Sequence, residues 1–153
     1  MISGMEKPEN RRLYEFTEDG NSCRIYEPRT PRYWYNYLWN EDRYCAQISQ
    51  VGHGRSYYLS EKAEMCMTNR DDARYVYLRD EDSQECWNMG LGPLNTEVED
   101  YCCTHSIGHS LICSKKNGVQ GSWRIFVPRK GHHEVWTMKL KNTEETEKHL
   151  SVF

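Results

Sequence analysis

The stretch Glu134-Val135-Trp136-Thr137-Met138-Lys139-Leu140 carries the clearest structural signal in the chain. Trp136, Met138 and Leu140 fall on one side of an extended backbone, and Thr137 and Lys139 fall on the other. Alternation with a period of two is typical of a strand that has one face buried and one face in water. The stretch therefore predicts a half-buried β-strand. After the polar connection 142–148, we predict that Leu150-Ser151-Val152-Phe153 is its pairing partner.

Similar patterns occur on both sides of this stretch. Segments rich in β-branched and aromatic residues, separated by Gly, Asn, Asp or Pro, predict further strands at Tyr14–Phe16, Ser22–Tyr26, Cys45–Ser49, Ser56–Leu59, Arg74–Arg79, Ser110–Cys113 and Ser122–Val127. No window fits the helical template of apolar residues at i, i+3, i+4 and i+7. Gly90–Leu94 is expected to be a long loop. Short strands with turns between them predict an all-β fold, an antiparallel β-sandwich.

The composition disfavours several classes of protein. The 153 residues include 20 Lys and Arg against 23 Asp and Glu, with both signs interspersed, so we expect no nucleic-acid partner. The longest apolar runs, such as Ile125-Phe126-Val127, are far shorter than the ~20 residues that span a bilayer, so we expect no membrane partner. The polar residues 1–12 lack the apolar run of a signal peptide. We therefore expect a cytoplasmic protein whose seven Cys remain thiols.

An aromatic cluster is the first candidate for function. Within twelve residues it holds Tyr33, Trp34, Tyr35, Tyr37, Trp39 and Tyr44, beside the polar side chains of Arg32, Asn36, Asn40, Asp42 and Arg43. Aromatic faces can pack against the C–H groups of a sugar ring while polar side chains bond its hydroxyls. The same residues can instead fill a sandwich core with their polar tips at its rim. Both interpretations, saccharide contact and core packing, stay open at the level of sequence.

Acidic clusters and a glycine-flanked histidine are weaker candidates. The clusters Asp71-Asp72, Asp80-Glu81-Asp82 and Glu97-x-Glu99-Asp100 could supply the two carboxyls of glycoside chemistry, but each lies beside turn residues and is expected to be a solvated turn. Gly52-His53-Gly54 could offer backbone N–H groups to an anion, although a turn between strands explains it equally well. No Gly-x-Ser-x-Gly motif indicates a nucleophile.

A metal site is a third hypothesis. Cys102, Cys103, His105 and His109 are residue types that bind zinc. However, adjacent residues of a strand point to opposite faces, and the chain has no Cys-x-x-Cys pair. We therefore expect a strand and its turn here, and no metal ligands.

Several segments together resemble the inverting glycoside phosphorylases of family 94, which include cellobiose, cellodextrin and chitobiose phosphorylases. The resemblance runs from Tyr26 to Phe153. It rests on Thr30-Pro31-x-x-Trp34-x-Asn36-Tyr37-Leu38, Tyr44-Cys45-Ala46-x-Ile48-Ser49, Gly54-x-Ser56-Tyr57-Tyr58, Arg74-Tyr75-Val76-Tyr77-Leu78-Arg79-Asp80 followed by Trp87, Phe126-Val127-Pro128, Glu134-Val135-Trp136, Leu140-Lys141-Asn142 and Leu150-Ser151-Val152-Phe153. The order and spacing of these segments make the match specific.

The resemblance implies a non-catalytic N-terminal domain of the galactose-mutarotase-like supersandwich kind. In that family the catalytic residues lie in a following (α/α)6 barrel, so no catalytic residue is expected here, and inorganic phosphate is a co-substrate of the full enzyme rather than a cofactor. The implied partners are that barrel, a second copy in a homodimer, and an oligosaccharide, a β-glucoside, bound by the full enzyme. Residues 1–25 are expected to form a polar lead-in with the first strand, and 26–153 an incomplete sandwich that stops before the barrel.

The resemblance also suggests residues for structure or for the rim of the sugar site. These carbohydrate-rim candidates are Trp34, Asn36, Tyr37, Arg74, Arg79 and Trp87. The sequence departs from the family pattern at His53 and Ala73, where relatives usually have Gly, and at His109, where they have an aromatic residue. A freestanding carbohydrate-binding module is the alternative hypothesis, motivated by the aromatic cluster.

Overall fold

The computed structural model describes residues 12–66 and 74–153, with no side chains described for 64–66. Within these residues the chain forms strands and no helix, so no helix of the described part could cross a membrane. The strands are β1 (Tyr14–Phe16), β2 (Ser22–Ile25), β3 (Tyr35–Trp39), β4 (Tyr44–Ser49), β5 (Ser56–Leu59), β6 (Glu64–Cys66), β7 (Tyr77–Asp80), β8 (Cys86–Asn88), β9 (Glu99–Ser106), β10 (His109–Lys116), β11 (Val119–Phe126), β12 (Val135–Asn142) and β13 (Leu150–Val152).

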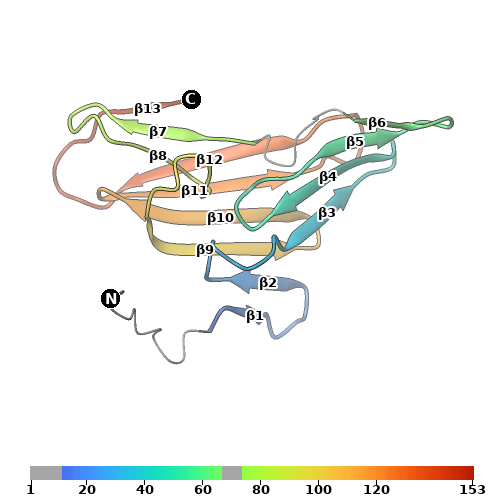
Figure 1. Ribbon diagram of the computed structural model, residues 1–153, viewed down its shortest axis with the longest axis horizontal. Coiled ribbons are helices and arrows are strands. Elements are labelled where there is room, and N and C mark those ends of the chain that lie inside the picture. Colours follow the sequence, from blue (N-terminus) through green and yellow to red (C-terminus); the bar gives the residue numbers. More distant parts are fainter. Residues whose placement is uncertain (1–11, 67–73) are drawn as a thin grey trace, which may run out of the picture.

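These strands form three antiparallel sheets. The largest has the order β1-β2-β9-β10-β11-β12, and the smaller ones have the orders β3-β4-β5-β6 and β13-β7-β8. Figure 1 shows β9 to β12 running side by side, with β1 and β2 continuing the sheet at one side, β7 and β13 on the opposite side, and β3 to β6 at the right of the view. The predicted antiparallel all-β sandwich is therefore confirmed.

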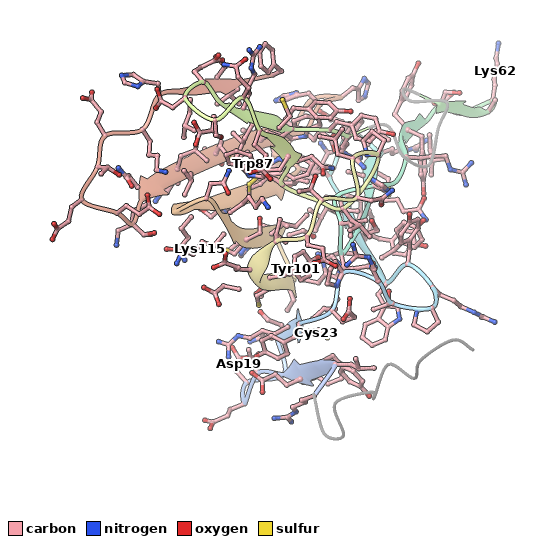
Figure 2. All side chains as sticks on the ribbon, turned by 60° about the vertical axis from the view of Figure 1, so that its left-hand side comes forward. Asp19, Cys23, Lys62, Trp87, Tyr101 and Lys115 are labelled. Carbon is pink, nitrogen blue, oxygen red and sulfur yellow. The ribbon has the colours of Figure 1, made fainter. Side chains whose placement is uncertain are left out.

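The core lies between the six-stranded sheet and the two smaller sheets. Along β11, Val119, Trp123 and Ile125 are buried, while Gln120 and Arg124 face water. The inward residues pack in one cluster with residues of all three sheets, including Leu38, Ala46 and Ile48 of the four-stranded sheet and Leu78 and Trp87 of the three-stranded sheet. In Figure 2, Trp87 and Tyr101 lie within the body of the molecule, whereas Lys62 projects from the tip of the β5–β6 hairpin.

The strand predicted at Glu134–Leu140 forms as β12, and Met138 and Leu140 pack against the core as the alternation indicates. The predicted pairing of this strand with Leu150–Phe153 is wrong. β13 pairs with β7 instead, and Tyr77 and Phe153 exchange two backbone hydrogen bonds of 2.9 Å. The chain leaves β12 toward the β10–β11 turn, because Thr143 N–H donates to the carbonyl of Gly118, and this carries the terminal segment away from the β12 edge.

Most other strand predictions are confirmed with shifted ends. The strand expected from Arg74 begins only at Tyr77, β10 extends beyond both predicted limits, and β11 begins earlier than predicted and ends one residue earlier, at Phe126. Gly90–Leu94 is a loop, as expected. Three strands, β3, β6 and β8, were not predicted as such. The expected boundary between residues 25 and 26 falls at the end of β2, which pairs with β9 in the large sheet.

Candidate functional site

Two of the six rim candidates lie in the interior. Trp87 is 1% exposed and belongs to the core between the sheets. Arg74 is also 1% exposed, and its guanidinium forms a bidentate pair with Glu134, at 2.7 Å from Nε to Oε1 and 2.9 Å from Nη2 to Oε2. Such burial favours the structural role for both residues, because neither side chain is accessible to a ligand in this conformation.

The Arg74 side chain joins the three sheets. Its Nη1 donates to the carbonyl of Gln47 on β4 at 2.9 Å, and Nη2 donates to the hydroxyl of Ser56 on β5 at 2.6 Å. Arg74 itself precedes β7, and Glu134 precedes β12. Tyr44 of β4 lies near the Arg74–Glu134 pair, and its burial raises the pKa of its phenol. The Arg74–Glu134 pair therefore fixes the place where all three sheets approach one another.

Hydrogen bonds of Trp34 and Asn36 connect the β3 segment to the large sheet. The amide of Asn36 donates to the carbonyls of Ser106 and His109 and to the hydroxyl of Ser110, at 2.9, 3.2 and 3.2 Å. The carbonyl of Trp34 lies 2.9 Å from Nε2 of His105, whose Nδ1 lies 2.9 Å from the same Ser110 hydroxyl. Because a carbonyl only accepts, Nε2 carries the proton and Nδ1 accepts. Burial lowers the pKa of His105, which agrees with a neutral ring.

The remaining candidates, Tyr37 and Arg79, are accessible to solvent. Tyr37 lies on β3 and is 56% exposed, whereas Arg79 lies on β7 and is placed near Glu81 and Gln84. They occupy different small sheets, so the structure does not join the six candidates into one site. Their proposed contact with sugar stays a prediction.

Beside Tyr37 lies an open groove to which the aromatic cluster contributes Trp39 and Arg43. It has a volume of about 700 Å³ and is lined by Trp39, Arg43, Cys45, Tyr57, Leu59 and residues 60–63. Trp39 is 79% exposed. The groove lies on the outer face of the four-stranded sheet, where Trp39 is opposite Cys45 and Cys45 is opposite Tyr57. An exposed indole and a phenol ring beside a guanidinium suit a ligand with both C–H faces and hydroxyl groups.

A run of aromatic rings extends from this face across the molecule. Consecutive ring centroids lie 5.7–6.3 Å apart along Tyr37, Tyr35, Tyr33, His53, Tyr75 and Tyr77. The run connects β3 to β7 and passes through the turn Gly52-His53-Gly54 between β4 and β5. The N–H of Gly52 donates to the carbonyl of Ser49 within that turn, which supports the turn interpretation over an anion site. His53 does not have a positive φ, so a side chain fits there.

The acidic clusters within the described residues show no carboxyl with a raised pKa. Oδ1 of Asp80 accepts hydrogen bonds from the backbone N–H groups of Ser83 and Asp82, and these bonds lower its pKa. Among the described residues, each carboxyl whose pKa departs from its ordinary value is shifted down. A general acid at neutral pH needs a raised pKa. Asp71, Asp72 and Ala73 lie outside the described residues.

The hypothetical zinc ligands do not converge. Cys103 faces the core, whereas Cys102 faces the other side of β9. Burial raises the pKa of the Cys103 thiol well above its usual range, which disfavours the thiolate that zinc requires. In the described part of the chain, no three His, Cys, Asp or Glu side chains are placed to hold a metal ion.

Fold and surface together define an antiparallel all-β sandwich with an aromatic-lined groove on the outer face of its four-stranded sheet. The profile of the family described as "Glycosyl hydrolase 94, supersandwich domain" matches residues 22–153. The chain therefore belongs to this family, in which it corresponds to the N-terminal supersandwich domain. The motifs that carry the resemblance have structural roles here. For example, buried Gln50 accepts from the N–H of Trp34 and donates to Thr30, which fixes the Thr30–Trp34 segment.

Three relatives illustrate the match. The chain is 39% identical over 138 residues to the 3-O-beta-D-glucopyranosyl-beta-D-glucuronide phosphorylase of Paenibacillus borealis. The aligned region covers 90% of this chain and 17% of the relative. The chain is 30% identical over 146 residues to the solabiose phosphorylase of the same organism and to the N,N'-diacetylchitobiose phosphorylase of Vibrio proteolyticus, covering 90% of this chain and 19% and 18% of the relatives. The chain thus spans about a fifth of the length of these curated relatives.

Proposed function

We propose that the chain serves as the non-catalytic supersandwich domain of a phosphorylase that cleaves a β-glucoside with inorganic phosphate. The observation that carries this proposal is the alignment of three phosphorylases over 90% of the chain. The proposed partners are a catalytic (α/α)6 barrel and, in a homodimer, a second copy of the enzyme. A cytoplasmic location belongs to the same proposal.

A domain exchange tests this function. The matching segment of the 39%-identical glucuronide phosphorylase is replaced by residues 22–153 of this chain, and release of sugar 1-phosphate from its own substrate is measured. We expect a folded, active chimera, because a supersandwich that performs the family role has to support the relative's catalytic part. A matched chimera with Arg74→Met should lose activity together with thermal stability, since Arg74 joins the three sheets.

Two results would contradict the proposal. A chimera that is folded by circular dichroism but inactive would show that this domain does not support catalysis. Sugar 1-phosphate formed by the isolated 153-residue chain, above a blank without protein, would show that the domain is not non-catalytic.

The exposed groove favours a second candidate function, direct carbohydrate binding. Trp39 and Tyr37 expose 79% and 56% of their surface on one sheet face, beside the guanidinium of Arg43. Titration with cello-oligosaccharides should then give a saturable change in tryptophan fluorescence. The change should be lost in Trp39→Ala and kept in Trp136→Ala, because Trp136, at 41% exposed, lies on β12, away from the groove. Flat traces beyond millimolar sugar would remove this candidate.

A further inference from the structure

Two cysteines lie directly opposite each other on the adjacent strands β9 and β10 of the large sheet. The register of β9 and β10 makes Cys102 and Cys113 direct partners. Directly opposed residues of antiparallel strands have Cα atoms roughly 4.5 or 5.5 Å apart. Both values lie within the Cα separation of roughly 4.4–6.8 Å that a disulfide spans. The backbone can therefore accept a bond between these two residues without moving the strands apart.

The two side chains lie on the same, outer face of the sheet. Their neighbours Cys103 and Ile112 are fully buried and point into the core, so the alternation of the strands places Cys102 and Cys113 on the opposite face. Both cysteines are half-buried rather than enclosed. Their outer-face neighbours include Thr104, whose hydroxyl lies 4.0 Å from the sulfur of Cys102. A small thiol reagent can therefore approach the pair.

The pair also marks the end of regular pairing. Beyond it the register shifts between Cys113 and Lys115, and Asp100 on β9 has a φ of 51°. These are the features of a β-bulge, where an extra residue interrupts the ladder. A covalent link at Cys102 and Cys113 would hold the strands in register where the ladder is interrupted.

We propose that Cys102 and Cys113, which are thiols under reducing conditions, form a reversible disulfide under oxidising conditions, a redox-controlled cross-link of the β9–β10 hairpin, by exchange with a low-molecular-weight disulfide such as oxidised glutathione. One cysteine thiolate attacks a sulfur of oxidised glutathione, forms a mixed disulfide and releases one glutathione thiolate. The second cysteine thiolate then attacks the mixed disulfide at the protein sulfur and releases the second glutathione. The protein loses two electrons and two protons, and oxidised glutathione takes up both.

The surroundings of the pair set the rate of this exchange. Partial burial raises the pKa of both thiols, and the proximity of Cys102 raises the pKa of Cys113 further. Thiolate is the reacting form, so the reaction is slow at neutral pH and faster near pH 8.5. The other described cysteines have no cysteine as a strand partner. Cys86, for example, is opposite Arg79.

The test treats the 153-residue chain with excess oxidised glutathione at about pH 8.5 and alkylates the remaining thiols. We expect at least two fewer alkylated cysteines than in the reduced chain, because the exposed Cys86 can also form a mixed disulfide with glutathione. Cleavage after Leu111 should yield peptides joined through Cys102 and Cys113. Cys102→Ser and Cys113→Ser should abolish the cross-link, whereas Cys86→Ser keeps it. The oxidised wild type should melt roughly 5–10 °C higher than the reduced form, and this difference should vanish in Cys102→Ser.

Other results would overturn the proposal. They are full alkylation of all seven cysteines after treatment, stable glutathione adducts on Cys102 and Cys113 in place of a cross-link, or a cross-link that joins other cysteines. Circular dichroism of each serine variant checks that the fold is kept. If a variant unfolds, the peptide map of the wild type alone decides the matter.

Discussion

Replacing Arg74 by Met removes the charge at the junction of the three sheets while keeping most of the side-chain volume. The change leaves the Glu134 carboxylate, which is 12% exposed, without its bidentate partner. It also removes the donors to the carbonyl of Gln47 and the hydroxyl of Ser56. Removing one member of a buried ion pair costs about 3–5 kcal/mol, because the remaining charge stays uncompensated. We expect a loss of that size in the free energy of unfolding.

Urea unfolding followed by tryptophan fluorescence measures this loss, because Trp87 and Trp123 are each 1% exposed and report on the core. A typical domain is stable by about 5–15 kcal/mol, so the variant would lose a large fraction of its stability. Glu134→Gln removes the opposite charge and leaves the guanidinium of Arg74, whose side chain is 1% exposed, uncompensated, so it should cost a similar amount, about 3–5 kcal/mol. The double variant should cost less than the sum of the two single changes, because its second substitution removes the charge that the first left unpaired.

The reasoning is refuted if Arg74→Met costs less than about 1 kcal/mol with an unchanged urea dependence, or if the two single changes are additive. The first result would mean that water or a rearranged side chain satisfies Glu134. The second would mean that the two groups are stabilised independently. If Arg74→Met does not fold, Glu134→Gln alone still tests the pair, since a neutral outcome there would contradict the burial of the ion pair.

Three further predictions concern other parts of the molecule. Because burial lowers the pKa of His105, the unfolded chain takes up its proton first, so stability should fall as the pH drops below about 6.5. His105→Gln should remove much of this fall in urea titrations at pH 7.5 and 5.5, whereas His149, whose pKa Asp82 raises, acts in the opposite direction. Gly52→Ala should lower the melting temperature by several degrees, because φ is 85° and the new Cβ would overlap the ring of Trp123. Gly20→Ala is the control: its φ is 69° and its Cβ would meet open space, so it measures the cost of a positive φ without a steric overlap. Trp39→Ala should change the free energy of unfolding by less than about 0.5 kcal/mol, because the ring is mostly exposed.

The sequence predicts a strand well where polarity alternates. β12 has apolar residues on one side and Thr137 and Lys139 on the other, and it forms as expected. Its pairing partner could not be predicted, because alternation reports which face is buried but not which strand lies alongside. β3 was missed for a related reason. Its inward face holds the polar Asn36 beside the apolar Leu38, and its outward face holds Tyr37 and Trp39, so its polarity does not alternate between the two faces.

The site was less predictable than the fold. Arg74 and Glu134 are 60 residues apart in the sequence, and no local pattern indicates that they pair. Some residues of the aromatic cluster fit the packing interpretation and others fit the saccharide interpretation. Tyr44 is buried in the core as the packing interpretation requires, whereas Tyr37 and Trp39 are exposed as the saccharide interpretation requires. Residue type alone could not separate them, since the same ring chemistry serves both environments.

The exposed aromatic residues of β3 point to an occupant of its outer face. Inside, Asn36 is explained by the chain itself, because its amide donates to three acceptors of β9 and β10. Outside, Trp39 has no such role, and the expected small effect of Trp39→Ala on stability tests that statement. If the variant keeps its stability and loses a sugar-induced fluorescence change, the ring serves a ligand. If it keeps its stability and no sugar binds, a neighbouring domain is the remaining reason for an exposed indole, and the chimera carrying Trp39→Ala should then lose activity or thermal stability.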